Sequence, residues 1–381
     1  LDPLAELKLD EYNVVVPDIT SMTREALKET GLDNKAVVKC KNMFALGICF
    51  WLFDRPEDYA LKYLDGKFAK KNPAVAQANK LAIAAGYNYA ANTHQFANNY
   101  TVAPAPREKG TYRSINGNVA TAWGLCAAAE KAGLPLFCGS YPITPATVIL
   151  EELAKRKDLG VKTVQAEDEI AGICTAIGAA FAGNFAVTTT SGPGLSLKSE
   201  ALGLAVMTEL PLVVVDVQRG GPSTGLPTKT EQSDLQQALY GRNGECPVIV
   251  VAASSPSDCF HYAFEAGRLA MEHMTPVILL TDGFIANGSE PWRIPEMKDY
   301  PAIQPPIVDK APEGGFMPYV RNEKLARGWA FPGKVGLEHR VGGLEKDCVK
   351  GCISHDPANH QKMTDTRAAK VAKVADDIPA Q

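Results

Sequence analysis

Residues 185–217, FAVTTTSGPGLSLKSEALGLAVMTELPLVVVDV, decide the fold class of this chain. A β-branched run (185–191) is followed by small residues, by a segment rich in Ala and Leu, and by a second apolar run (211–217). Continuous runs of this kind are typical of strands in a parallel sheet whose two faces are both covered. Strand, helix and strand in this order predict one unit of a parallel α/β sheet with right-handed crossovers.

The same alternation continues on both sides and spans residues 118–290. Helical segments rich in Ala and Leu separate four further candidate strands, at 134–138, 162–166, 247–253 and 276–282. The predicted fold class is therefore α/β, with an open, doubly wound and mostly parallel sheet. Ligands of such sheets bind outside the carboxyl ends of the strands, so the loops that follow the strands form the candidate site.

The flanking regions carry weaker patterns. Residues 1–94 are interpreted as part of a smaller α/β domain, with strands at 13–19 and 36–39. Residues 95–117 contain Asn, Pro, Gly and Arg without apolar periodicity, which predicts a linker. Residues 291–381 are rich in Pro and then in charged residues, and we expect an extended connector there.

The composition is that of an ordinary globular protein and argues against two classes of partner. Hydrophobic residues make up 46% of the chain and charged residues 22%, with a net charge of −4. The sequence lacks a stripe of basic residues of the kind that binds nucleic acid. The longest apolar runs, such as 43–53, are shorter than the roughly 18 residues that a membrane-spanning helix needs.

Nine cysteines at irregular spacing argue against a disulfide framework and favour a reducing compartment, the cytoplasm. The sequence contains no CxxC pair, so we expect no iron–sulfur or zinc ligand set in this chain. Cys348 and Cys352, with His355 and His360 nearby, could imitate a metal site. Their polar and unpatterned surroundings favour a surface loop.

Two candidate strands are followed by motifs that lead into helices. In CGSYPITPAT (138–147), Pro145 suits a first helical turn, and Thr144 is a candidate N-cap, either at the ligand edge or as a plain capping residue. In AEDEIAG (166–172), three acids precede an uncharged helix. Two of them are expected to be ordinary helix-start residues. The third is expected in an apolar cleft with a raised pKa, which proton transfer near neutral pH requires.

The other two loops combine glycine with polar side chains. TTTSGPGLS (188–196) contains Gly192 and Gly194, which let backbone N–H groups approach a ligand closely. Its spacing is that of neither a dinucleotide-binding motif nor a P-loop. QRGGPSTGLPTKTEQSDL (218–235) gathers Arg219 with several hydroxyl residues, which suits a carboxylate ligand. An ordinary β-to-α loop is the alternative.

YPITPAT, EDEIAG, TTTSGPG and RGGPSTGLPTKTEQSDL occur in this order between residues 141 and 235. Together they resemble the pyrimidine-binding domain of 2-oxoacid:ferredoxin oxidoreductases, over residues 118–290. CKNMFALGICFW and GYNYAANTH, before the linker, resemble the C-terminal part of the γ-type domain, which one branch of the family fuses in front of the α-type domain. The loop RGGPSTGLPT is more similar to the 2-oxoglutarate and broad-specificity branches than to the pyruvate branch.

The resemblance implies roles for individual residues. Glu169 matches the family's cofactor glutamate, which would hydrogen-bond N1′ of the aminopyrimidine ring of thiamine diphosphate and act as the catalytic carboxyl. Glu167 is the alternative if the register shifts by two residues. Thr144, Arg219 and Thr228 match positions that contact the substrate, with Arg219 on its carboxylate. Further cofactor contacts are implied at Tyr141, Pro142, Ile143, Ser191 and Gly192.

The resemblance also implies an activity: a 2-oxoacid, above all 2-oxoglutarate, reacts with CoA to give an acyl-CoA such as succinyl-CoA, CO₂ and reduced ferredoxin. The reverse reaction would fix CO₂ in a reductive tricarboxylic acid cycle. The sequence has LDGK (64–67) and TDGF (281–284) but lacks the GDG motif that holds the diphosphate and Mg²⁺ in thiamine enzymes. The resemblance therefore places Mg²⁺ and a [4Fe-4S] cluster on a β-type partner subunit in an (αβ)₂ assembly, with no metal ligand in this chain. Relative to the family, the chain is expected to be cut at both ends.

Two other interpretations stay open. The chain could belong to a non-oxidative thiamine-dependent decarboxylase or synthase, whose activity would need neither ferredoxin nor CoA. It could also be a non-catalytic α/β binding subunit, in which replacing Glu169 would leave turnover intact.

Overall fold

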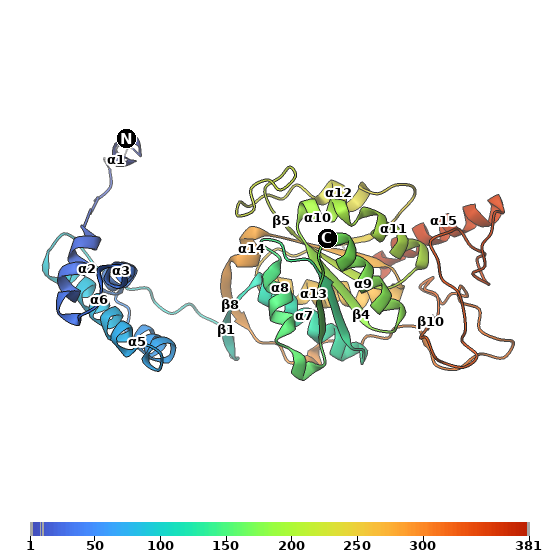
Figure 1. Cartoon of the computed structure of the whole chain (residues 1–381), viewed down its shortest axis with the longest axis horizontal. Coiled ribbons are helices and arrows are strands. Elements are labelled where there is room, and N and C mark those ends of the chain that lie inside the picture. Colours follow the sequence, from blue (N-terminus) through green and yellow to red (C-terminus); the bar gives the residue numbers. More distant parts are fainter. Residues whose placement is uncertain (1–2, 8, 10, 379–381) are drawn as a thin grey trace. The chain divides into compact units, whose positions relative to one another are not determined.

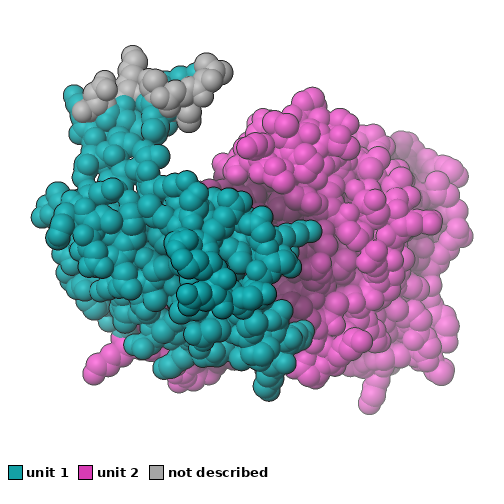
Figure 2. Space-filling view, turned by 60° about the vertical axis from the view of Figure 1, so that its left-hand side comes forward, with its two compact units in different colours: residues 1–108 teal, residues 109–381 magenta. Residues whose placement is uncertain are grey.

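The computed structural model describes residues 3–7, 9 and 11–378. The chain divides into two compact units, Leu1–Glu108 and Lys109–Gln381, which Figure 2 colours separately. The outermost residues of the ranges expected at 1–94 and 291–381 lie outside the described residues. Each unit has its own buried core.

The described residues of the first unit form helices and no strand. A small core of Leu27, Val37, Cys40, Ala78 and Ala82 holds three of these helices together. The elements are α1 (Pro3–Glu6), α2 (Ile19–Leu27), the 3₁₀ turn η1 (Lys28–Thr30), α3 (Asn34–Lys39), α4 (Lys41–Leu52), α5 (Asp58–Leu64), the π-helical turn η2 (Asp65–Ala69) and α6 (Pro73–Asn92).

The strands expected at 13–19 and 36–39 are wrong. α2 begins at Ile19, where the Asp18 carboxylate accepts a hydrogen bond from the Ser21 N–H (3.0 Å). The second expected strand lies in α3, whose start is capped in the same way by Asp33. An aspartate cap satisfies the free N–H groups of a first turn, and packing of the helix then outweighs the strand preference of the β-branched residues.

The second unit is built on a parallel sheet of six strands in the order β3-β2-β4-β5-β7-β6. This confirms the α/β fold class with a doubly wound parallel sheet, and each strand overlaps one expected from the sequence. The strands are β2 (Leu136–Ser140), β3 (Lys162–Gln165), β4 (Phe185–Thr190), β5 (Leu212–Gln218), β6 (Ile249–Ala252) and β7 (Pro276–Asp282).

Helices cover both faces of the sheet (Figure 1). One core lies between the sheet and α7, α8 and α13, and a second lies between the sheet and α9 to α12. The helices are α7 (Gly117–Ala132), α8 (Thr147–Ala154), α9 (Glu169–Phe181), α10 (Gly192–Leu197), α11 (Ser199–Thr208), α12 (Leu235–Tyr240), α13 (Asp258–His273) and α14 (Gly283–Asn287), with a 3₁₀ turn η3 (Lys157–Leu159).

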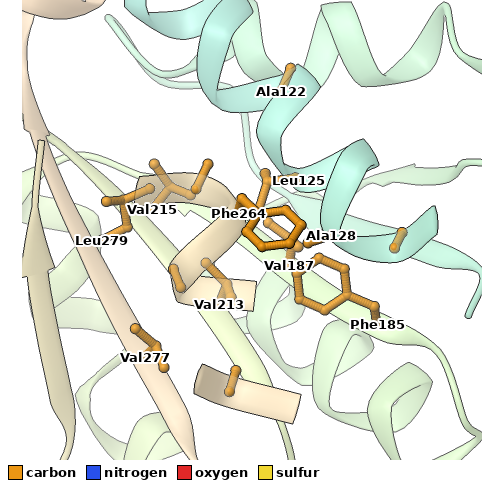
Figure 3. Close-up of a cluster of buried hydrophobic side chains, with 14 of the residues drawn as sticks. Ala122, Leu125, Ala128, Phe185, Val187, Val213, Val215, Phe264, Val277 and Leu279 are labelled. Atoms are coloured by element: carbon orange, nitrogen blue, oxygen red, sulfur yellow. The ribbon is translucent and has the colours of Figure 1, made fainter. Parts of the chain in front are cut away.

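The two cores explain why the amino-terminal parts of the central strands are apolar on both faces. β4, β5 and β7 are buried along their whole length. Their alternate side chains point to opposite faces, so both sets must be apolar to pack. Figure 3 shows Ala122, Leu125 and Ala128 of α7 and Phe264 of α13 against Phe185, Val187, Val213, Val215, Val277 and Leu279 of these strands.

The expected linker and connector contain more structure than their composition indicates. The end of the linker forms β1 (Tyr112–Asn116), which pairs antiparallel with β8 (Ser289–Arg293). After β8 the chain is irregular but ends in a long polar helix. The remaining elements are η4 (Met297–Asp299), β9 (Ile307–Val308), β10 (Trp329–Ala330), α15 (Pro357–Ala372) and η5 (Lys373–Asp376).

The polar helix α15 was missed because it lacks an apolar face. Its buried side chains include Arg367 and Lys370, which are normally exposed. Its start nevertheless has a clear signal, since the Asp356 carboxylate accepts a hydrogen bond from the Ala358 N–H (3.0 Å) and Pro357 occupies the first turn. Among the described residues, no helix is long and apolar enough to cross a membrane.

Candidate functional site

The carboxyl ends of the six parallel strands meet at one edge of the sheet, and the four motifs follow strands that end there. In Figure 1 this edge points upward, where α10, α12 and the yellow-green loop after β5 lie. The chain runs from β2 outward to β3 and returns to β4 on the other side of β2. In doubly wound sheets a ligand crevice forms at such a reversal. The segments that follow β2 and β4 therefore flank the candidate site.

Thr144 does not cap a helix, contrary to expectation. α8 begins at Thr147, with Ala146 as its N-cap and no side-chain capping bond. Thr144 is exposed, and the peptide bond to Pro145 is cis. Its carbonyl oxygen accepts a hydrogen bond from Arg219 Nη1 (2.6 Å). A contact between two loops, rather than the start of a helix, thus holds Thr144 at the edge.

The three acids at the start of α9 lie in different environments. Glu167 and Asp168 are exposed, and the Asp168 carboxylate caps α9 by accepting a hydrogen bond from the Ala171 N–H (2.6 Å). Glu169, the first residue of α9, is only 7% exposed. The structure thus agrees with the expectation that one of the acids is buried. That acid is Glu169 and not the alternative Glu167.

Glu169 lies against the glycine turn after β4. A Cβ atom at Gly194 would lie 2.8 Å from Glu169 Cγ and 3.1 Å from its Oε1, so only glycine leaves room for this side chain. No donor among the described residues hydrogen-bonds the Glu169 carboxylate. A buried carboxylate without an internal donor is suited to a polar ligand atom.

Lys198 contacts the backbone of Glu169. It is fully buried, and its Nζ donates a hydrogen bond to the backbone carbonyl of Glu169 (2.8 Å). Burial lowers the pKa of Lys198 to about 8, although the charge of Glu169 acts in the opposite direction. The lysine fixes the backbone at the start of α9 and places a cationic group next to the buried acid.

Arg219, which directly follows β5, is also buried, with 6% of its surface exposed. Besides its bond to Thr144, its Nη2 donates to the carbonyl of Thr224 (3.0 Å). Its Nε is buried and has no partner among the described residues. Arg219 therefore joins the loops after β2 and β5, and its contact with a substrate carboxylate stays a prediction. Thr228 lies on the exposed part of the same loop.

The five positions expected to contact a cofactor lie on both sides of the reversal point. Ser191 and Gly192 are buried, and Ser191 Oγ has no partner in the described part of the chain. Tyr141 is exposed, whereas Pro142 and Ile143 are half-buried. The structure thus brings the predicted residues to one edge of the sheet, while their roles stay predictions.

Four buried polar residues at this edge were not found from the sequence: Asn118, Lys198, Asp216 and Asp234. Asn118 Nδ2 donates to the carbonyl of Pro145 (3.0 Å) and so supports the loop that carries Thr144. Asp216 interrupts the apolar run of β5. A charged residue inside an apolar run is costly to bury without a reason, and this signal could have identified Asp216.

The structure supports no metal centre in the part of the chain that it describes. No group of three or more His, Cys, Asp and Glu among those residues could hold a metal ion. Asp282 of TDGF caps α14 by accepting hydrogen bonds from the Phe284 and Ile285 N–H groups (2.7 and 3.2 Å). Cys352 is exposed, in agreement with the surface-loop interpretation, whereas Cys348 is half-buried and its N–H donates to Asn359 Oδ1 (2.9 Å).

The fold and this edge define a ligand-binding α/β domain with a buried carboxyl group beside a glycine turn. Residues 128–353 match the family described as pyruvate flavodoxin/ferredoxin oxidoreductase, thiamine-diphosphate-binding domain. The match extends to residue 353, so residues 291–353 of the segment expected to be a connector lie within the matched region. The free carboxylate of Glu169 fits a ring nitrogen of the aminopyrimidine of that cofactor.

Known relatives agree with this family. The chain is 54% identical over 371 residues to the 2-oxoglutarate oxidoreductase subunit KorA of Mycobacterium tuberculosis, covering 97% of this chain and 56% of that protein. It is 44% identical to the 2-oxoglutarate synthase subunit KorA of Methanocaldococcus jannaschii, over 69% of each. It is also similar to a 2-oxoglutarate:ferredoxin oxidoreductase from Magnetococcus marinus, solved with 2-oxoglutarate, coenzyme A and succinyl-CoA bound, with a TM-score of 0.83 and 37% identity over 94% of this chain and 60% of that one.

The chain belongs to the pyruvate flavodoxin/ferredoxin oxidoreductase family and carries its thiamine-diphosphate-binding domain. It resembles the α subunits of 2-oxoacid:ferredoxin oxidoreductases, with KorA among its relatives. The chain spans little more than half of the Mycobacterium relative, 56% of its length.

Proposed function

We propose that this chain is the cofactor- and substrate-positioning part of the α-type subunit of a 2-oxoglutarate:ferredoxin oxidoreductase. The enzyme would convert 2-oxoglutarate and CoA to succinyl-CoA, CO₂ and reduced ferredoxin, and could run in the reverse direction. The observation that carries the proposal is the burial of Glu169, at the ligand edge of the sheet, with a carboxylate that no described donor satisfies.

In this proposal Glu169 holds the proton that it shares with N1′ of the aminopyrimidine. When bound, thiamine diphosphate supplies the nucleophilic carbon and the electron sink for decarboxylation. Gly194 keeps the space beside Glu169 open, and Lys198 holds the backbone of the glutamate in place. Ser191 and Gly192, together with Tyr141, Pro142 and Ile143, would form the walls of the cofactor site.

The loop after β5 would hold the substrate. Arg219 provides a buried positive charge close to Thr144, and Thr228 lies on the exposed part of the loop. A guanidinium is favourable for a carboxylate, and 2-oxoglutarate carries two. The buried Nε of Arg219 lacks a partner among the described residues, which supports a role beyond joining two loops.

A β-type partner subunit would complete the site. The sequence has neither a GDG motif nor a CxxC pair, so we assign Mg²⁺, the diphosphate and a [4Fe-4S] cluster to that partner in an (αβ)₂ assembly. Apolar side chains are exposed on segments that follow strands at this edge of the sheet, among them Ile170 (50%), Leu226 (59%) and Phe284 (72%). Such side chains are typical of an interface. With nine free cysteines, we place the complex in the cytoplasm.

The test is the variant Glu169→Gln in the purified complex, which keeps the shape of the side chain but removes its acid. Reduction of methyl viologen with 2-oxoglutarate and CoA should fall by at least about a hundredfold, the lower range of a general acid or base contribution. The matched control is Glu167→Gln, two residues earlier and exposed, which should retain activity.

Normal activity of Glu169→Gln, or an equal loss in Glu167→Gln, would contradict the proposed site. The substrate is tested by comparing 2-oxoglutarate with pyruvate and branched 2-oxoacids. Turnover of 2-oxoglutarate without CoA and without an electron acceptor would instead indicate a non-oxidative thiamine enzyme.

A further inference from the structure

Two aspartates anchor the end of the loop that follows β5. Asp216 lies within β5 and is fully buried, and Asp234 precedes α12 and is 8% exposed. The Asp234 N–H donates to Gln218 Oε1 (3.0 Å), and Gln218 Nε2 donates to the carbonyl of Thr281 (3.1 Å). The two ends of the loop that carries Arg219 and Thr228, at Gln218 and Asp234, are therefore hydrogen-bonded to each other beside the sheet.

The two carboxyl groups lie next to each other: Asp234 packs on Gly192, two residues after Thr190, which is in register with Asp216 in the sheet, and each acid acts on the pKa of the other. Both oxygens of Asp216 and Oδ2 of Asp234 are buried, and no N–H or hydroxyl group among the described residues donates to them. Two carboxylates in a dry site repel each other and cannot both be ionised. The contact is favourable only if one of them carries a proton.

Within the part of the chain that the structure describes, no cation is found to act on this pair. In the sheet, Asp216 is in register with Thr190 of β4 and Leu280 of β7, neither of which is ionisable. The one other charged group that acts on Asp234 is the acid Glu231, whose Oε2 accepts a hydrogen bond from the Gly221 N–H (2.9 Å). Among the described residues, the charged groups that act on the pair are therefore acids, which favours its protonated form.

The pair also contacts the glycine turn of the candidate cofactor site. A Cβ atom at Gly192 would lie 2.8 and 3.0 Å from the two carboxylate oxygens of Asp234, so the carboxyl group packs directly on the Gly192 backbone. Gly192 is only two residues from Gly194, which contacts Glu169. Asp234 therefore connects the substrate loop, through the glycine turn, to the catalytic carboxyl.

We propose that Asp216 and Asp234 share one proton, donated by Asp216 to the Asp234 carboxylate, and that this bond holds the substrate loop against the Gly192 turn. The two aspartates are positioning residues: they touch neither substrate nor cofactor in this proposal. Their effect on the reaction rests on the proposed function, whereas the shared proton itself does not.

If the two acids share a proton, the stability of the folded protein must depend on pH. Burial and the mutual repulsion of the acids raise the pKa of Asp216 well above its ordinary value of 3.8, and burial raises the pKa of Asp234. The folded protein therefore holds a proton that the unfolded chain releases. By linkage, the bound proton contributes fully to the free energy of unfolding below pH 3.8. This contribution is lost as the pH rises through the pKa of Asp216 in the folded protein.

The first measurement is the unfolding midpoint of the purified complex between pH 4 and pH 9, for the wild type and Asp216→Asn. The amide of the variant can donate to Asp234 but has no proton to lose. The wild-type midpoint should fall with rising pH relative to that of the variant, and Asp234→Asn, which takes away the repulsion between the two acids but leaves Asp216 buried, should weaken the same dependence. Parallel midpoint curves in wild type and both variants would overturn the proposal, whatever reaction the enzyme catalyses.

The second measurement compares Asp216→Asn with Asp216→Val, which cannot donate. The valine variant should have a KM for 2-oxoglutarate at least about tenfold higher, because the loop that carries Arg219 and Thr228 is no longer held against the Gly192 turn. Its KM for CoA should stay unchanged, because the CoA site does not depend on this loop. The asparagine variant should restore KM to within about threefold of wild type. An asparagine variant as impaired as the valine variant would show that Asp216 does not act as a hydrogen donor.

Discussion

At the scale of single residues, the candidate site contains charged groups that are buried and that each contact a specific neighbour. Glu169, Lys198 and Arg219 are each less than a tenth exposed, although such residues normally lie at the surface. Each has a specific neighbour: the glycine turn for Glu169, a backbone carbonyl for Lys198, and two loop carbonyls for Arg219. Burial strengthens their interaction with a charged ligand, because water no longer screens it.

Arg219 gives a prediction at this scale. Replacing it with alanine should raise KM for 2-oxoglutarate about 10- to 100-fold, because hydrogen bonds to charged groups contribute roughly 1.5–3 kcal/mol. Arg219→Lys keeps the charge but cannot bridge the carbonyls of Thr144 and Thr224, so it should recover only part of the loss. Steady-state kinetics of the whole enzyme, with KM for CoA as the internal control, measure both effects. A KM for 2-oxoglutarate that stays at its wild-type value would place the carboxylate pocket elsewhere.

At the scale of elements, glycines decide how closely helices approach their neighbours. In the first unit, α4 and α6 pack with their backbones nearly in contact. A Cβ atom at Gly86 of α6 would overlap the carbonyl of Phe44 in α4, and one at Gly47 of α4 would overlap the carbonyl of Ile83 in α6. The same principle operates at Gly194, where the neighbour is the candidate catalytic carboxyl.

Gly86→Ala should destabilise the first unit. Alanine is the better helix former by about 1 kcal/mol, but forcing apart packed helices costs roughly 1–3 kcal/mol, so the steric cost should dominate. Urea unfolding followed by far-UV circular dichroism measures the change. Gly66→Ala is the control within the same unit, because a methyl group there meets no atom within 4 Å. If Gly86→Ala were as stable as that control, the close packing of α4 and α6 would be wrong.

At the scale of the whole second unit, the polar segment after β8 is part of the folded domain. Glu209, buried at the turn before β5, accepts hydrogen bonds from both terminal nitrogens of Arg321 (2.6 Å each) and from Lys370 Nζ (2.5 Å). Lys370 also donates to the carbonyl of Met274, and Arg327 to that of Glu209. These bonds attach residues 321–370 to the end of the sheet opposite the candidate site.

Glu209→Gln should lower the free energy of unfolding by about 3–5 kcal/mol, because it leaves two buried cations without their counter-charge. The matched control is Glu296→Gln, which breaks an exposed pair with Lys298 and should cost at most about 1 kcal/mol. Urea titration of both variants at pH 7 measures the difference. Equal stability of the two variants would contradict a structural role for the Glu209 cluster.

The cluster also predicts how stability depends on acid. Despite the cost of burial, Lys370 and Arg321 lower the pKa of Glu209 from 4.5 to about 2. The Glu209 carboxylate therefore contributes to the free energy of unfolding above pH 4.5, and this contribution is lost as the pH falls through about 2. The difference in unfolding midpoint between wild type and Glu209→Gln should narrow over this range. A constant difference would show that the carboxylate is not responsible.

The sequence alone determined the parallel sheet and the place of the site. Continuous apolar runs such as 211–217 favour strands with two covered faces, and the loops that follow parallel strands share one edge, so this edge, Arg219 and the glycine turn were predicted without coordinates. Among the three acids, the residue pattern made no choice, and only the resemblance of the motif to a known family pointed to Glu169. These are local patterns, and local patterns are visible in a sequence.

Only the tertiary structure decided which polar groups are buried and against what. Burial separated Glu169 from Glu167, hydrogen bonds joined Arg219 to Thr144 and Lys370 to Glu209, and the fold placed the buried Asp234 against the Gly192 turn. Each of these contacts joins residues that different elements bring together, or depends on the side of an element that faces the core. The environment of a charged side chain is set by the whole fold, and the sequence around it does not contain that information.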